Sequence, residues 1–498
     1  MLLPDKIYLG NSTRPEYLAL KFGNRHGLVT GATGTGKTVT LQSIAEGFSA
    51  AGVPVFAADI KGDLSGIAAM GKMLDWQTKR ATEIGFTDYA ASKSPTIFWD
   101  LFGKQGHPIR TTISEMGPLL LSRILDLNDT QEGVLNIAFK YADDNGLLIL
   151  DLKDLRALLV EIAGNSQAIS TQYGNVATAT VGAVQRQLLV LEQQGGDKFF
   201  GEKALDIKDF MRTTYDGKGF VSVLAADELM RAPRLYATFL LWLLSELFEV
   251  LPEVGDPDKP RLVFFFDEAH LLFDDAPKAL VDKVEQVVKL VRSKGVGVYF
   301  VTQNPVDIPD AVLAQLSNRV QHALRAYTPK EQKAVRMAAK SFRPNPDFST
   351  EEVITQLGIG EALVSVLEEK GVPSIVGRTL IRPPSGQVGP LTPEERQAVI
   401  ASSPVTGMYD EMVDRESAYE VLTKKSEERQ AAQAAEDQAA AQAKEAAARE
   451  KAERAALPRR STRQTPVEAA INSFSRTMAS SLGRALVRGI LGGLTRGR

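Results

Sequence analysis

The sequence contains no cysteine, and this absence excludes two classes of site. Disulfide bonds require cysteine, and so do zinc or iron–sulfur centres that are held by thiolates. The fold must therefore be stabilised by core packing, and any metal ion must bind to oxygen or nitrogen ligands.

The chain also lacks an apolar run that is long enough to span a bilayer. Its longest apolar stretch, residues 239–251, is interrupted by Ser245, Glu246 and Glu249, whereas a spanning helix needs about 20 predominantly apolar residues. The first residues, MLLPDKIYLG, lack the basic stretch and the apolar run of a signal peptide. We therefore expect a soluble, cytoplasmic protein with no integral membrane segment.

The chain lacks a net positive charge except at its end. Residues 459–498 carry eight arginines, no lysine and one acid, Glu468, which gives +7; since the whole chain carries −3, residues 1–458 carry −10. This balance argues against a globally basic nucleic-acid-binding body, although a basic pore within an acidic body remains compatible with it.

What is present is ample material for a core, because 44% of the 498 residues are hydrophobic. Composition and periodicity suggest one large body with an inserted subdomain. The predicted parts are the first half of the core (1–104), an inserted helical subdomain (105–215), the second half of the core (216–403), a helical spacer rich in Ala, Glu, Gln and Lys (404–458) and a basic amphipathic tail (459–498).

The pattern of apolar residues predicts an α/β fold with a mostly parallel sheet. A strand at 27–30 is followed by a glycine loop, a helix to about 51 and a second strand at 53–58. Continuous apolar runs at 262–266 and 296–302 are typical of central parallel strands. Further strands are predicted at 220–225, 320–325, 362–368 and 374–381, the last two as a hairpin.

The first glycine loop carries the strongest chemical signal. It has the phosphate-loop pattern, in which backbone N–H groups surround phosphate oxygens at the start of a helix. Lys37 is placed to reach the β- and γ-phosphates of ATP, and the Thr38 hydroxyl to hold Mg²⁺. The predicted nucleotide-binding residues are Gly31, Ala32, Thr33, Gly34, Thr35, Gly36, Lys37, Thr38 and Val39.

Polar residues at the ends of two later apolar strands complete the predicted site. Asp267 follows the run LVFFF and is expected to orient Mg²⁺ through water, while Glu268 is expected to polarise a water for attack on the γ-phosphate. Gln303 follows the run at 296–302 and would lie beside Glu268 if the two strands are neighbours. Alone, each pattern also fits a solvated turn or a strand-end cap, but the upstream phosphate loop favours catalysis.

The segment DIKGD, residues 59–63, follows the second strand at the same sheet edge. It could contact the nucleotide site or lie in a loop that faces a pore, and a plain charged turn is an equally good interpretation.

Taken in order, GATGTGKT, DIKGD, FFFDEAH, VRSKG and YFVTQNP resemble the HerA–FtsK lineage of P-loop motors, and NRVQHALRAYTPKE resembles its HerA-like (YjgR-type) bacterial group. The resemblance covers about residues 1–400. It implies a RecA-like ATPase core of the additional-strand, catalytic-Glu type, helicase-like motor activity with ATP and Mg²⁺, and a homo-oligomer, usually a hexameric ring. It also implies that Arg292 reaches the nucleotide of a neighbouring subunit; Arg319 and Arg325 are weaker candidates for such interface roles.

The polymer on which such a motor acts stays open at the level of sequence. The resemblance implies double-stranded DNA, but Asn304 stands where FtsK-type motors have an arginine, and no sequence-reading DNA module is recognisable. A motor that acts on protein or another polymer is the first alternative, and a nucleotide-regulated assembly scaffold is the second. The intact Lys37, Thr38, Asp267, Glu268 and Gln303 argue against a scaffold that lacks activity.

The basic tail has an apolar stripe with arginines between its members. Docking against the ATPase ring is the favoured interpretation, because four glycines weaken an isolated helix and the rest of the chain is acidic. Contact with DNA phosphates and binding to a membrane surface are the alternatives.

Overall fold

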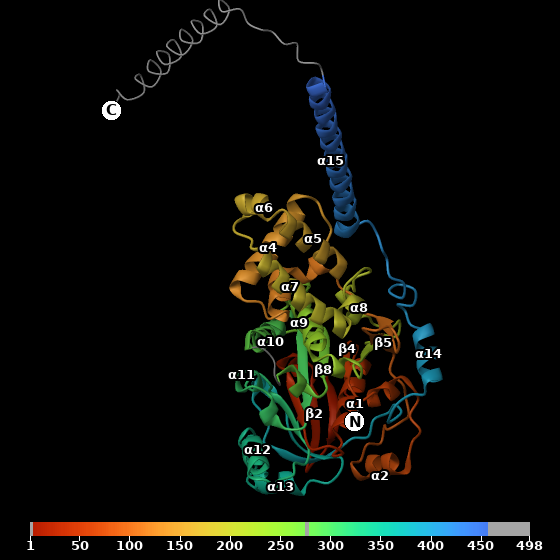
Figure 1. Cartoon of the computed structure of the whole chain (residues 1–498). Coiled ribbons are helices and arrows are strands. Elements are labelled where there is room, and N and C mark those ends of the chain that lie inside the picture. The colour runs from red at the N-terminus through yellow and green to blue at the C-terminus, as the bar shows by residue number, and fades with distance from the viewer. Residues whose placement is uncertain (1–2, 274–277, 457–498) are drawn as a thin grey trace, which may run out of the picture. The chain divides into compact units, whose positions relative to one another are not determined.

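The computed structural model describes residues 3–273 and 278–456 (Figure 1). It divides into two units, the first ending at Lys424 and the second beginning at Lys425. Every strand that the structure describes belongs to the first unit. The predicted tail at 459–498 lies outside the described residues, so its three alternatives remain predictions.

The first unit is built on one twelve-stranded sheet, in the spatial order β2-β1-β12-β11-β10-β3-β9-β8-β4-β7-β5-β6. The eight strands from β10 to β6 run parallel, and the four at the other end pair antiparallel. The strands are β1 Lys6–Asn11, β2 Pro15–Ala19, β3 Gly27–Thr30, β4 Val55–Asp59, β5 Thr96–Asp100, β6 His107–Pro108, β7 Val221–Ala225, β8 Leu262–Phe266, β9 Val296–Thr302, β10 Asn318–Gln321, β11 Glu361–Ser365 and β12 Gly377–Ile381.

Strand β9 lies between β3 and β8, and this insertion is the additional strand that the resemblance implies. Thr30 of β3 pairs with Thr302 of β9, and Phe266 of β8 pairs with Phe300 of β9 and Ala58 of β4. Because all four strands run parallel, the residues that follow their carboxyl ends meet at one edge of the sheet, where open α/β sheets bind ligands.

Alternate residues of the central strands enter two separate cores. Phe264 and Phe266 pack on one face of the sheet with residues of α9 and α10, whereas Phe265 packs on the other face with Leu41 and Phe48 of α1. Both faces are therefore covered, which explains why β8 and β9 are apolar and buried along their whole length.

Helices of the first unit cover this sheet and extend beyond it (Figure 1), and α15 continues into the second unit. In chain order, the α-helices that the structure describes are α1 Lys37–Ala50, α2 Asp75–Glu83, α3 Ile113–Ile124, α4 Asp129–Asp144, α5 Leu152–Gly164, α6 Ser166–Tyr173, α7 Thr178–Leu191, α8 Asp197–Phe199, α9 Pro233–Val250, α10 Lys278–Val291, α11 Asp310–Leu313, α12 Pro329–Lys340, α13 Thr350–Gln356, α14 Pro393–Ala401 and α15 Ala418–Ala456. Within the described ranges, none of the helices combines the length and the apolar character needed to cross a bilayer.

Helices α3 to α8 follow one another between β6 and β7 and form a helical insertion. Capping boxes fix where three of them begin: Thr112 caps α3, Asn128 caps α4 and Asp151 caps α5. Their buried leucines belong to the same hydrophobic cluster as one face of the sheet, so the insertion packs as part of the first unit.

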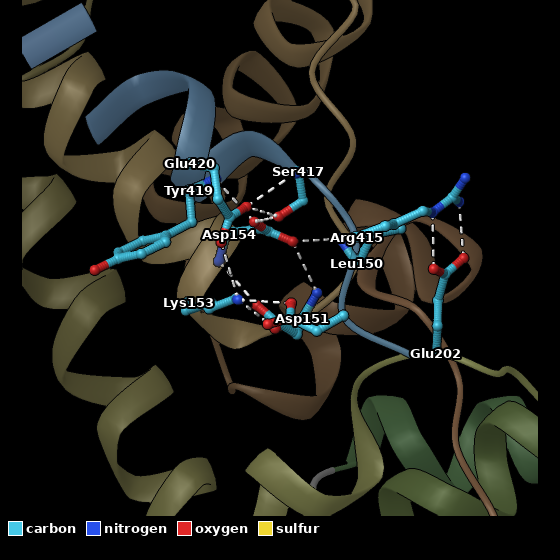
Figure 2. A network of polar contacts seen from close by, with 10 residues as sticks. Leu150, Asp151, Lys153, Asp154, Glu202, Arg415, Ser417, Tyr419 and Glu420 are labelled. Carbon is cyan, nitrogen blue, oxygen red and sulfur yellow. Dashed lines mark hydrogen bonds and ion pairs between the residues drawn. The ribbon is translucent and has the colours of Figure 1, made fainter. Parts of the chain in front are cut away.

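After the sheet, the chain returns to this insertion and is held there by a polar network (Figure 2). The buried Asp154 of α5 accepts hydrogen bonds from the hydroxyl group of Ser417 (2.5 Å) and the backbone N–H of Tyr419 (2.9 Å). Arg415 binds both carboxylate oxygens of Glu202 at 2.7 and 2.8 Å. Residues 405–422, which we name the return segment, thus pack into the first unit beyond the change of composition at Pro404, with Val405 buried in the core.

Two predicted features of the sheet need correction. The strand expected at 320–325 is β10 Asn318–Gln321. It ends early because its parallel partner β3 ends at Thr30, opposite Gln321, where the glycine loop leaves the sheet. Strand β5, Thr96–Asp100, was not expected; it is fully buried beside β7.

Candidate active site

The segment between β3 and α1 is an open loop whose backbone is turned by glycines. Gly34 and Gly36 have φ of +79° and +113°, values that favour glycine. A Cβ atom at Gly34 would meet no heavy atom within 4 Å, so the loop faces open space. Helix α1 begins at Lys37 without a side-chain cap. Free N–H groups at a helix N-terminus attract anions, and the loop therefore fits a phosphate group.

The side chain of Lys37 lies folded against this loop. Its Nζ donates hydrogen bonds to the carbonyl oxygens of Gly31 (2.7 Å) and Ala32 (3.2 Å). Burial lowers the pKa of Lys37, although the carboxylates of Glu268 and Asp267 oppose this shift. The two carbonyl oxygens satisfy a buried ammonium group that would otherwise lack acceptors.

Asp267 and Glu268 follow β8 at the same edge of the sheet. Asp267 is buried, and its Oδ1 accepts the backbone N–H of Glu268 at 2.9 Å. Burial and the neighbouring Glu268 raise the pKa of Asp267 to about 6. Glu268 has φ +46° and ψ +48°, a left-handed conformation that costs a non-glycine residue about 1 kcal/mol or more and is often found at functional sites.

The carboxylate of Glu268 has a partner at each oxygen. Lys61 Nζ lies 2.5 Å from Oε1, and Gln303 Nε2 donates to Oε2 at 3.3 Å. His270 Nδ1 is 3.5 Å from Oε2, too far and too poorly aligned to count as a hydrogen bond. Burial alone would raise the pKa of Glu268, but the hydrogen bond and charge of Lys61 outweigh it and leave the pKa below its ordinary value.

The DIKGD segment forms a tight loop after β4, and the structure places it at this site. Asp59 accepts the backbone N–H groups of Gly62 (2.9 Å) and Leu64 (3.0 Å), which holds the loop closed. Burial and the nearby Asp267 raise the pKa of Asp59 to about 7. Of the interpretations left open by the sequence, contact with the candidate nucleotide site is the one that the geometry matches, through Lys61.

Two residues at the end of β10 also belong to this region, and sequence reasoning missed the first. His322 is buried; its Nε2 lies 2.8 Å from Thr40 Oγ1 and its Nδ1 2.8 Å from the carbonyl oxygen of Glu361. Arg325 lines a cavity of about 500 Å³ together with Thr33 and Gln303. Both residues come after the carboxyl end of a parallel strand. Polar residues at such positions are candidates for a ligand site, so the sequence could have indicated them in this way.

Arg292 does not join the other predicted residues within one subunit. It lies just before β9, in contact with Asp256 (Nη2 to Oδ1, 3.5 Å). Since β9 is seven residues long, Arg292 is about 20 Å from the edge that holds Gln303, at roughly 3.3 Å per residue. Arg319, by contrast, donates to the carbonyl oxygens of Leu313 and Leu316.

The residues at this edge fit a nucleotide with a magnesium ion better than a metal centre made by protein alone. No group of three or more His, Asp or Glu side chains that could hold a metal ion occurs in the part of the chain that the structure describes. Mg²⁺ in nucleotide sites needs few protein ligands, because phosphates and waters supply the others. Thr38, the second residue of α1, and Asp267, which directly follows β8, remain the two predicted protein ligands.

Sheet order, glycine loop and strand-end acids together define a P-loop NTPase of the RecA-like, additional-strand type. The family model of the helicase HerA-like C-terminal domain matches residues 5–498, and the chain belongs to this family. The resemblance found in the motifs is thereby confirmed at the level of the family. No curated protein matches the chain.

Several solved structures are similar to this chain. A trigonal form of the bacterial conjugative coupling protein TrwBdeltaN70, in complex with sulphate, has a TM-score of 0.48 and 16% identity over 74% of this chain and 89% of its own. VirB4 of Thermoanaerobacter pseudethanolicus has a TM-score of 0.47 and 14% identity over 76% of this chain and 97% of its own. TrwB in complex with ADP and Mg²⁺ has a TM-score of 0.47 and 16% identity, covering 74% and 89%.

Proposed function

We propose that the chain is a magnesium-dependent ATPase that works as a ring motor and couples ATP hydrolysis to the translocation or remodelling of double-stranded DNA. One observation carries the hydrolytic part of this proposal: the Glu268 carboxylate is held beside Gln303, at the sheet edge where Lys37 lies folded on an open glycine loop at the uncapped start of α1. Membership of the HerA-like family supports the motor part.

Each residue of the site has a separate task in this proposal. Lys37 leaves the loop carbonyls and pairs with the β- and γ-phosphates, and the N–H groups of residues 31–39 surround them. Glu268 accepts the proton of the attacking water, and Gln303 holds that water beside it. Magnesium held by Thr38, and by Asp267 through water, would neutralise charge that develops on the phosphates.

The hydrolytic part is tested by two substitutions that separate binding from turnover. We expect Lys37→Ala to weaken ATP binding and abolish turnover, because the phosphates lose their cation. Glu268→Gln should bind ATP normally and lose about 10²- to 10⁴-fold in turnover, since the amide cannot accept the proton. Phosphate release and the binding of a fluorescent ATP analogue measure the two effects.

Glu351→Gln, a change of the same kind at an exposed position of α13, is the matched control and should leave both quantities unchanged. Full turnover in Glu268→Gln would remove this residue from the role of general base.

The identity of the polymer on which the motor acts is tested by the effect of DNA on ATP turnover. If double-stranded DNA is the substrate, a duplex should stimulate turnover, and retention on DNA should weaken as salt rises. The net charge of −10 on residues 1–458 favours the second candidate, a motor that acts on protein or another polymer. Turnover that no duplex stimulates, combined with no salt-sensitive retention, would support that candidate.

A further inference from the structure

Lys61 stands at the open side of the candidate general base. The side chain of Glu268 is only 5% exposed, whereas that of Lys61 is 41% exposed, and their charged groups are 2.5 Å apart. The ammonium group therefore lies between the solvent and the oxygen Oε1. A general base must bring one oxygen within hydrogen-bond distance of the water that it activates, and in this arrangement the lysine occupies that approach.

The other contacts of Glu268 leave little freedom to the carboxylate itself. Gln303 holds the second oxygen, and the left-handed backbone at Glu268 fixes the direction in which its side chain leaves the chain. The Glu268 side chain is consequently the fixed member of the pair.

The loop that carries Lys61 is anchored at its base and open at its tip. Asp59 binds the N–H groups of Gly62 and Leu64, so the backbone of the loop is held in place. A Cβ atom at Gly62 would meet no heavy atom within 4 Å, so the loop is open at the residue that follows Lys61, whose own side chain is 41% exposed. A long, flexible lysine side chain at such a position can swing away without any movement of the sheet.

We propose that Lys61 is a latch on the general base: its ammonium group covers the Glu268 carboxylate and restrains hydrolysis until the lysine side chain moves away. This inference rests on the proposed ATPase function and assigns a positioning role to a residue outside the phosphate loop. It separates Lys61 from Lys37, which faces the loop carbonyls and contacts phosphate in the proposed function.

The test compares Lys61→Met, which keeps the length of the side chain without its charge, with the wild type in steady-state ATP hydrolysis. We expect kcat to rise about two- to fivefold, the range that a partly exposed ion pair can account for. The KM for ATP should stay within about twofold, since a latch residue does not bind the phosphates. Lys61→Arg should restore the low kcat because it keeps the ion pair.

Lys72→Met, at an exposed position further along the same connecting segment, is the matched control and should behave as the wild type. If Lys61→Met does not fold, as judged by its thermal midpoint, Lys61→Gln takes its place with the same expected rise in kcat.

Three results would overturn the latch. A kcat that falls toward that of Glu268→Gln would make Lys61 a required catalytic group, and a lower kcat with a raised KM would make it a phosphate ligand. An unchanged kcat would reduce the ion pair to a structural contact. In all three cases the wild type still turns over ATP, so the proposed function survives. ATP binding without turnover in both wild type and Lys61→Met would instead refute the proposed ATPase, and the latch with it.

Discussion

His322 shows how a single buried side chain can link helix α1 to the sheet. Its Nδ1 lies 2.8 Å from a carbonyl oxygen, that of Glu361, which accepts only, so this nitrogen carries the proton. Its Nε2, 2.8 Å from Thr40 Oγ1, is then the acceptor of the threonine hydroxyl group. Only the bond accepted by Nε2 needs a neutral ring. The bond to Glu361 favours the protonated ring, but burial outweighs it and lowers the pKa of His322 to about 4.

This low pKa makes the stability of the fold depend on pH. Between about pH 6.5 and pH 4 the unfolded chain binds a proton at His322 and the folded chain does not, so the free energy of unfolding falls as the pH falls. The loss is complete near pH 4 and amounts to roughly 3 kcal/mol. Thermal midpoints at pH 7 and pH 4.5 measure it.

His322→Gln is the informative variant, because glutamine can donate to Glu361 and accept from Thr40 without titrating. We expect its thermal midpoint to fall less than that of the wild type over the same pH range. Equal losses in both proteins would show that other groups cause the dependence on pH.

At the scale of elements, the apolar strands that build the centre of the sheet could be predicted from the sequence. Strands β8 and β9 are continuous apolar runs because both faces of the sheet are covered, and that pattern identifies them without further information. Strand β5, TIFWD, is as long as β8, but its apolar run covers only Ile97, Phe98 and Trp99 between Thr96 and Asp100, which is too little to identify a strand from local sequence. The end of β10 depends on where β3 ends, which is a property of strand pairing that local sequence cannot supply.

The residues of the candidate site also fall into those that the sequence could predict and those that it could not. Residues within one motif, such as Lys37 and Thr38, could be predicted because a local loop conformation brings them to the phosphates. The contact of Gln303 with Glu268 was conditional on neighbouring strands, and β8 and β9 are neighbours. The pairing of Lys61 with Glu268 joins residues from separate strands, and only the order of the strands decides it.

The return segment gives a prediction at the same scale. Asp154 lies in α5 and accepts hydrogen bonds from both sides: from the N–H of Leu150 (2.8 Å) and from Ser417 and Tyr419 of the return segment. Asp154→Ala leaves the buried N–H of Leu150 without this acceptor, at a cost of about 1–3 kcal/mol, and removes the acceptor of the Tyr419 N–H. The hydroxyl group of Ser417 keeps its bond to Glu420 (2.7 Å). We therefore expect a lower thermal midpoint and faster tryptic cleavage after Arg415.

Lys140→Ala removes an exposed ion pair within α4 and serves as the control, since such pairs contribute about 0.3–0.5 kcal/mol. Its cleavage rate at Arg415 should equal that of the wild type. If Asp154→Ala lowers the thermal midpoint without faster cleavage there, the network stabilises the insertion but does not hold the return segment.

At the scale of the whole molecule, the position of Arg292 decides how a complete site could arise. Arg292 and Arg25 both contact Asp256, at 3.5 and 2.9 Å, near the amino ends of the strands. The nucleotide-side residues lie at the carboxyl ends, so Arg292 cannot serve its own site. In a closed ring with head-to-tail interfaces, one edge of each subunit can face the opposite edge of the next. The proposed role of Arg292 therefore requires a neighbouring subunit, which a closed ring supplies to every site.

Mixing inactive subunits tests this requirement directly. Arg292→Ala should lose about 10³-fold or more in turnover if the arginine stabilises charge on the transferring phosphoryl group, and Glu268→Gln is inactive for its own reason. When the two are mixed, a subunit with intact Glu268 can receive Arg292 from its neighbour. An equal, random mixture should complete about one quarter of the sites in a ring with head-to-tail interfaces. We expect phosphate release to recover to about that fraction of the wild-type rate.

The mixture of Lys37→Ala with Glu268→Gln is the matched negative control, because both residues belong to the same subunit's site and no arrangement completes it. Arg25→Ala, which removes the other arginine at Asp256, should hydrolyse ATP when assayed on its own, without being mixed with a second variant. Recovery in the first mixture and none in the second would support shared sites. If the Arg292→Ala mixture stays inactive while both variants assemble, or if the wild type turns over ATP at full rate as a monomer, Arg292 acts only within its own subunit, where its contact with Asp256 is structural.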